Sequence, residues 1–137
     1  MIDRQIEDRI KYYFRNYIIL KHEIEEQEEE IREGSPSMDG QPRGTSISNP
    51  TEATAQRLDK LREDKEWLEV VDMTYDYWKK RMPDKAKLMH MRYDSRYKPM
   101  KIQGRLFISY TTYYEWHNDA ITCAALIAAS KKLIEIK

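Results

Sequence analysis

Large and apolar residues recur at alternating steps of four and three along the first 33 positions. These positions are Ile6, Ile10, Tyr13, Tyr17, Leu20, Ile24, Gln27 and Ile31, and most of the residues between them are charged. The spacing is the a/d pattern of a coiled-coil helix. A helix of about 30 residues is roughly 45 Å long and cannot bury such a seam against itself. Residues 1–33 are therefore predicted to form a long acidic amphipathic helix that packs on a second long helix, on another copy of the chain, or on both.

Residues 34–50 separate this helix from the next one. They are rich in Gly, Pro and Ser and have no apolar period, a composition that predicts a linker or long loop. We expect Gly34 to be the C′ residue that ends the first helix. Asn49 is expected to be the N-cap of the second helix, with Pro50 at its first position.

A second long helix is predicted over residues 51–82, and Pro83 ends or kinks it because proline cannot continue the hydrogen-bond ladder. Its apolar face is wider and more aromatic than that of the first helix, which places it nearer the main core. The residues of this face are Leu58, Leu61, Leu68, Val71, Tyr75, Trp78 and Met82. The three tryptophans, Trp67, Trp78 and Trp116, are expected to anchor the core.

Residues 83–137 predict two short helices and a longer one. The first short helix covers residues 84–93, the second covers residues 100–106, and the long helix runs from Tyr110 to about Ile134. The inward residues of the first are Ala86, Leu88, Met89 and Tyr93. Alternating β-branched residues, which mark strands, are nearly absent. The predicted fold class is all-α, with long coiled-coil-like N-terminal helices and a C-terminal region of shorter helices.

Residues 101–121 have the parts of a helix-turn-helix: a short helix, a tight turn, and a helix whose N-terminal half can enter the major groove of DNA. Ile102 and Leu106 are placed to anchor the short helix, and Ile108 to fill the turn. Ser109 is the expected N-cap of the following helix. The inward face of that helix is predicted to contain Tyr113, Trp116, Ala120 and Ala124.

Side chains suited to DNA gather on this helix and just before it. Asn can pair with adenine, Glu can accept from cytosine N4, and a Thr methyl group can contact thymine. Hydroxyl and basic groups more often reach phosphates. The predicted DNA-binding residues are Arg92, Arg96, Lys98, Lys101, Arg105, Ser109, Tyr110, Thr111, Thr112, Tyr114, Glu115 and Asn118.

The charge distribution supports this placement although the net charge of the chain is zero. Residues 1–33 have six basic and ten acidic side chains, whereas residues 84–137 have ten basic and five acidic ones. The molecule is therefore polarised, and its C-terminal part is the part suited to a polyanion.

Other chemistry is sparse in the sequence. The single Cys123 excludes an intramolecular disulfide and a multi-cysteine zinc site. His22, His90 and His117 are scattered, and the sequence contains no Gly-rich phosphate loop and no nucleophile motif. We expect no enzyme activity, no cofactor and no metal.

No apolar run reaches the about 18 residues that a membrane span needs. The first residues lack the basic-then-apolar pattern of a signal peptide. The expected location is the cytoplasm.

Several short motifs follow one another along nearly the full chain. They are Ser35-Pro36, Asn49-Pro50-Thr51-Glu52, Met91-Arg92-Tyr93, Ile102, Leu106, Ile108-Ser109, Thr112-Tyr113-Tyr114 and Ala120. In this order they resemble the RinA/ArpU family of phage transcriptional regulators. The C-terminal region of that family is similar to region 4 of sigma factors, where L-R-Y and I-A-x-x-L-x-I-S frame a helix-turn-helix. Two features depart from the pattern: Gln103 stands where the family has Ala, and no Lys or Arg occurs between Ser109 and Ser130.

The resemblance implies a sequence-specific DNA-binding regulator that activates phage late or packaging genes in the cytoplasm of a host bacterium. It implies double-stranded DNA as a partner, while the acidic long helix would form a homodimer or contact RNA polymerase. Two alternatives stay open. A small terminase subunit would assemble as a ring and bind a packaging site, so its molar mass in solution distinguishes it from a regulator. A structural coiled-coil adaptor would not need the polar face of the last helix.

Overall fold

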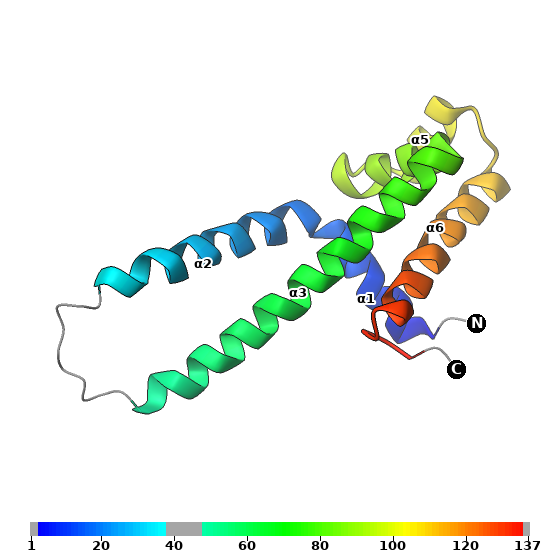
Figure 1. Ribbon diagram of the computed structural model, residues 1–137. Coiled ribbons are helices and arrows are strands. Elements are labelled where there is room, and N and C mark those ends of the chain that lie inside the picture. Colours follow the sequence, from blue (N-terminus) through cyan, green and yellow to red (C-terminus); the bar gives the residue numbers. More distant parts are fainter. Residues whose placement is uncertain (1–2, 38–47, 136–137) are drawn as a thin grey trace. The chain divides into compact units, whose positions relative to one another are not determined.

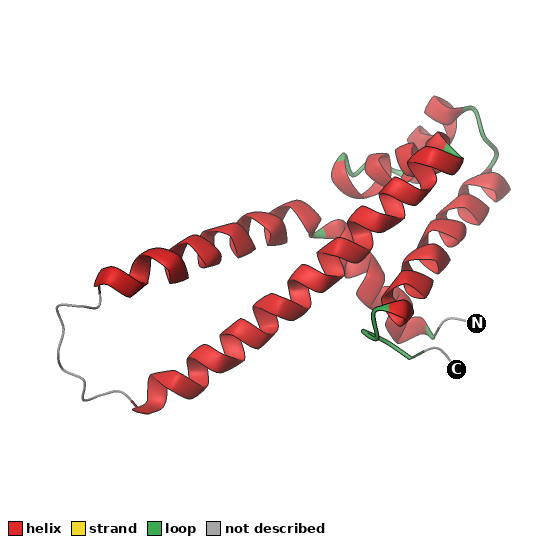
Figure 2. Ribbon diagram, in the orientation of Figure 1, coloured by secondary structure: helices red, strands yellow, loops and turns green. Residues whose placement is uncertain are grey.

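The computed structural model describes residues 3–37 and 48–135, and every regular element in these ranges is a helix (Figure 2). The predicted all-α class is confirmed. The elements in chain order are α1 (Arg4–Arg15), α2 (Tyr17–Ser37), α3 (Ser48–Arg81), α4 (Pro83–Met89), the π-helical segment η3 (His90–Asp94), α5 (Pro99–Leu106) and α6 (Tyr110–Ser130) (Figure 1).

The chain divides into two compact units. Unit 1 comprises Met1–Tyr17 and Trp67–Lys137, and unit 2 comprises Ile18–Glu66. The division falls at Tyr17 and at Trp67, inside the long helical segments expected over residues 1–33 and 51–82.

The first helical segment consists of two helices, so the expectation of one continuous helix is wrong. Asn16 leaves the helical region with φ −104° and ψ 14°, and its side-chain Nδ2 donates to the carbonyl oxygen of Tyr12 at 2.9 Å. An Asn side chain that bonds the backbone locally competes with the helical ladder. The a/d seam nevertheless has buried members on both sides of the break, Ile10 and Tyr13 before it and Leu20 and Ile24 after it.

The expected ends of the two long helices are also corrected. α2 continues past Gly34 to Ser37, and no glycine in the described residues has a positive φ, so Gly34 is not a left-handed C′ residue. α3 begins at Ser48, which places Asn49 inside the helix instead of at its N-cap. A helical Gly costs only about 1 kcal/mol, and local residue preferences therefore do not fix a helix end by themselves. The remaining part of the expected linker, residues 38–47, lies outside the described residues.

In unit 2, α2 and the N-terminal half of α3 face each other. Lys65 forms an ion pair with Glu28, and Leu61 of α3 is buried like the seam residues of α2. Leu58, expected on the apolar face of α3, is 37% exposed. Leu61 is therefore enclosed in unit 2, whereas Leu58, about one turn earlier in α3, is not.

The core of unit 1 is aromatic. The rings of Tyr13 in α1 and Trp67 in α3 stack in parallel with centroids 5.1 Å apart. Phe14 packs against Tyr75 of α3 and Tyr93 of η3. The residues expected to face inward from the first short helix, Ala86, Leu88, Met89 and Tyr93, are all buried. Trp67 is confirmed as a core anchor, whereas Trp78 and Trp116 are half-buried.

The long C-terminal helix is shorter than expected. α6 ends at Ser130, four residues before Ile134, and Lys132 adopts a left-handed conformation with φ 64°. The amide of Leu133 donates to the carbonyl oxygen of Ala128 at 2.9 Å. This bond and the left-handed residue close the last turn in the manner of a helix C-cap.

Gly104 offers a stabilising substitution inside α5. A Cβ atom built at this exposed position would meet no heavy atom within 4 Å, and Gly104 does not have a positive φ. Because Gly in a helix interior is less favourable than Ala, we expect Gly104→Ala to raise the free energy of unfolding by about 0.5–1 kcal/mol. Urea unfolding followed by circular dichroism measures this. A lower unfolding midpoint would show that the backbone at position 104 needs the freedom of glycine.

Candidate nucleic-acid interface

The connection between α5 and α6 has the local geometry expected from the sequence. Phe107 follows α5 in a left-handed conformation, and the amide of Ile108 donates to the carbonyl oxygen of Gln103 at 3.1 Å. The Oγ atom of Ser109 then accepts from the amide of Thr112 at 3.1 Å. Ser109 is thus confirmed as the N-cap of α6. The short helix is held by Ile102, which is fully buried.

The inner face of α6 is close to the expected one. Tyr113, Ala120 and Ala124 are fully buried as predicted. Trp116 is half-buried, and the neighbouring His117 occupies the interior instead, with 5% of its surface exposed. His117 lies four residues after Tyr113 and three before Ala120. The helical spacing could therefore have identified it as an inward residue.

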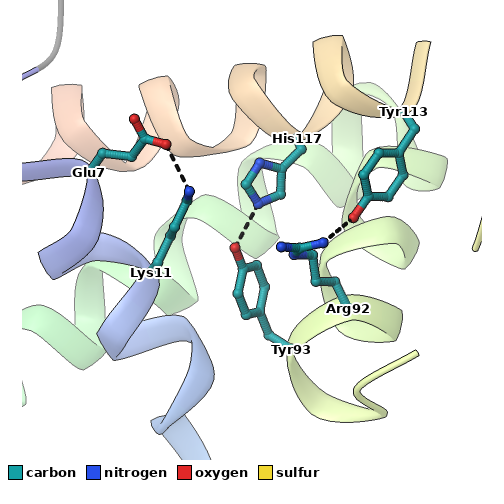
Figure 3. A network of polar contacts seen from close by, with 6 residues as sticks. All are labelled: Glu7, Lys11, Arg92, Tyr93, Tyr113 and His117. Carbon is teal, nitrogen blue, oxygen red and sulfur yellow. Dashed lines mark hydrogen bonds and ion pairs between the residues drawn. The ribbon is translucent and has the colours of Figure 1, made fainter. Parts of the chain in front are cut away.

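A set of polar contacts connects α6 to η3 in unit 1 (Figure 3). The Nη1 atom of Arg92 donates to the hydroxyl of Tyr113 at 2.6 Å. The hydroxyl of Tyr93 and Nε2 of His117 are hydrogen-bonded at 2.6 Å. Two consecutive residues of η3 thus each bond a side chain of α6, which orients α6 on the fold.

Burial shifts the pKa values of the histidine and tyrosine side chains in this set. Desolvation lowers the pKa of His117 to about 4, and the nearby charges of Arg92 and Lys11 act in the same direction. Desolvation also raises the pKa of Tyr93 and of Tyr113. His117 is therefore neutral at physiological pH, and both tyrosines retain their protons.

A further polar link joins α4 to α6. The buried Lys85 forms an ion pair with Asp119 at 2.7 Å, and its ammonium group lies 4.2 Å from the ring centroid of Trp78. Asp119 therefore offsets the charge of a lysine within the fold.

The opposite face of α6 is open to solvent. The predicted residues on it, Ser109, Tyr110, Thr111, Tyr114, Glu115 and Asn118, are all exposed, and Thr112 is half-buried beside the cap. The residues Tyr110 and Tyr114 are one helical turn apart, and their ring centroids lie 4.7 Å from each other. The polar face is thus accessible within unit 1 while its inward neighbours are buried.

The basic side chains predicted to bind DNA are exposed with one exception. Arg96, Lys98, Lys101 and Arg105 are exposed. Lys101 and Arg105 lie over the ring of Tyr97, with the Lys101 Nζ atom 4.0 Å and the Arg105 Cζ atom 5.1 Å from its centroid. Tyr97 was not predicted as a site residue. Its ring makes cation–π contacts with both of these basic side chains. Arg92 differs from the other four because it is half-buried and bonded to Tyr113.

Within the described ranges, no cluster of three or more His, Cys, Asp or Glu side chains could hold a metal ion. Desolvation raises the pKa of the half-buried Cys123 thiol. None of the helices in the described part of the chain is both long and apolar enough to cross a bilayer.

Comparisons with known proteins add no further observation to this geometry. No known protein family, curated protein or solved structure matches this chain.

Proposed function

We propose that this chain is a sequence-specific DNA-binding transcription regulator in which α5 and α6 form the helix-turn-helix. The observation that carries the proposal is the contrast between the two faces of α6. Its Tyr/Thr/Asn face is exposed beside exposed cations, and its opposite face is buried around Tyr113 and Ala120. The resemblance to RinA/ArpU regulators adds the expected role, activation of phage late or packaging genes in a host bacterium.

In the proposed complex the N-terminal half of α6 enters the major groove. Asn118 is suited to adenine, Glu115 to cytosine N4, and the Thr111 methyl group to thymine. The hydroxyl groups of Ser109 and Thr112 and the positive end of the helix dipole favour phosphates.

Four exposed cations would position the protein on the DNA backbone. Arg96, Lys98, Lys101 and Arg105 can each neutralise one phosphate. Four such contacts give a slope of roughly −3.6 in log affinity against log salt concentration. Arg92 is left out of this set because its guanidinium donates to Tyr113.

Unit 2 is the proposed partner-binding part. Glu25, Glu26, Glu29 and Glu30 of α2 are exposed, and they present an acidic surface that DNA would repel. We propose that this coiled-coil-like helix pair forms a homodimer or contacts RNA polymerase, while unit 1 binds the promoter.

The proposal is tested by selecting duplexes from a random-sequence library with the purified protein and measuring binding by gel shift at low salt. The triple variant Thr111→Ala/Tyr114→Ala/Asn118→Ala is expected to bind the selected duplex at least about tenfold more weakly, because direct base contacts contribute about 1–3 kcal/mol each. All three side chains are exposed, and surface substitutions of this kind usually change stability by less than about 0.5 kcal/mol each.

The matched control changes exposed uncharged residues of unit 2, Thr54→Ala/Gln56→Ala, and should bind like the wild type. If no duplex is enriched, or if the triple variant binds as well as the control, α6 is not a recognition helix.

A further inference from the structure

Phe107 occupies an unusual position between α5 and α6. It has φ 56° and ψ 49°, and the residue is 92% exposed. An L-residue in the left-handed region is strained by contact between its Cβ atom and the backbone, and a bulky residue there is an outlier. The ring also gains almost no burial in the fold. Glycine would adopt this conformation without strain and would expose no apolar ring to water.

The left-handed conformation alone does not single out Phe107. Arg96 and Lys132 also have positive φ values, 58° and 64°. These two residues keep long charged side chains in water, which costs little. Phe107 has the same strained backbone conformation at the C-cap of α5 but exposes an apolar ring to water, and a strained residue whose side chain the fold does not use is a reason to look for function.

The surroundings of Phe107 point to DNA as the partner of its ring. It lies two residues before Ser109, the N-cap of α6, and so beside the helix end proposed to enter the major groove. The exposed rings of Tyr110 and Tyr114 follow on α6, and the exposed Arg105 precedes it on α5. In the major groove the apolar group available to an aromatic ring is the 5-methyl group of thymine.

We propose that Phe107 contacts a thymine methyl group at the edge of the bound site and so adds a specificity-determining residue to the interface. The inference rests on the proposed DNA-binding function. It assigns the turn, and not only the helix that follows it, a role in reading sequence.

The experiment uses the full chain and the duplex that the wild type selects from a random-sequence library. Phe107→Gly is expected to bind this duplex about tenfold more weakly, since burying a Phe ring on a partner is favourable by roughly this factor. The same variant is expected to raise Tm by a few degrees, because glycine takes the left-handed conformation without strain. A residue with a purely structural role would not lose binding while gaining stability.

Replacing thymine by deoxyuridine, one position at a time, removes the methyl group and leaves the base pair intact. One such replacement should weaken binding of the wild type and leave binding of Phe107→Gly unchanged, so that the two changes are not additive. Phe107→Asn, which also tolerates the left-handed region, should behave like the glycine variant.

Lys132→Gly is the matched control. It replaces another left-handed residue at the far end of α6, roughly 30 Å away along a helix of 21 residues. It should raise Tm with unchanged affinity for the duplex. Equal affinity of Phe107→Gly and wild type, or equal sensitivity of both to deoxyuridine at every thymine of the site, overturns the inference while the proposed function stands. A failure to select any duplex removes the proposed function itself.

Discussion

Trp67→Ala is expected to lower the free energy of unfolding by about 3–5 kcal/mol, the range for removing a fully buried large aromatic side chain. Only 1% of Trp67 is exposed. Its indole stacks on Tyr13, and the guanidinium Cζ atom of Arg9 lies 5.2 Å from its ring centroid. Since small domains have about 5–15 kcal/mol of stability in total, the variant should be close to its unfolding threshold. Urea unfolding followed by circular dichroism measures the loss.

Trp67→Phe separates the packing of this ring from its polar atom. The indole Nε1–H is buried and makes no hydrogen bond to any group in the described residues, so phenylalanine loses none of the hydrogen bonds seen there and keeps an aromatic face against Tyr13. The expected loss is about 1 kcal/mol, well below that of alanine. Similar losses for Phe and Ala would mean that the stacking with Tyr13 does not stabilise the core.

The importance of Trp67 could not be derived from the apolar period alone. A three-and-four pattern identifies one stripe on a helix, and it correctly placed Leu68, Val71 and Tyr75 in the interior. Trp67 and Val70 lie beside that stripe and are buried as well. The C-terminal half of α3 therefore buries a wider surface than a two-helix seam requires, a tertiary effect that helical periodicity does not encode.

Breaks within helices were the least predictable features. Asn16 interrupts the first segment, and its side-chain amide donates to the carbonyl oxygen of Tyr12, although an Asn at this position does not by itself end a helix. The π-helical turn of η3 closes with a bond from the amide of Ser95 to the carbonyl oxygen of His90 at 3.0 Å. The extra residue of such a turn changes the facing of the side chains that follow it. Here Arg92 and Tyr93, adjacent in sequence, both bond α6.

The local structure around the candidate site was more predictable than the core because its signals are local. A serine N-cap and the helical steps from Ile102 to Ala120 depend on a few neighbouring residues. The contact that Arg92 makes could not be predicted from its sequence neighbours. As a basic residue it was expected to contact phosphate, and its bond to the hydroxyl of Tyr113 depends on how η3 packs against α6.

His117 is expected to make the stability of unit 1 depend on pH. Burial lowers the pKa of His117 to about 4 in the folded chain, whereas the unfolded chain should have the ordinary value near 6.5. Between these values the unfolded state binds more protons than the folded state. The stabilising contribution is therefore fully present above about pH 6.5 and is lost as the pH falls toward 4. From about pH 7 to about pH 5 the free energy of unfolding should fall by about 2 kcal/mol through this residue.

Urea unfolding of wild type and His117→Gln at the two pH values measures this contribution. Glutamine stays neutral and can still bond the Tyr93 hydroxyl, so the variant should be less pH-dependent by about 2 kcal/mol over the interval. The hydrogen bond with Lys11 lowers the pKa of Glu7. The stabilising contribution of Glu7 is therefore lost only as the pH falls below the ordinary glutamate range. Measurements above about pH 5 avoid most of this loss. His90→Gln is the matched control, because His90 is partly exposed and paired with Asp94 at 2.7 Å. The His90→Gln variant should be as pH-dependent as the wild type, because it retains His117. If His117→Gln is also as pH-dependent as the wild type, the imidazole of His117 takes up a proton without disturbing its contact with Tyr93.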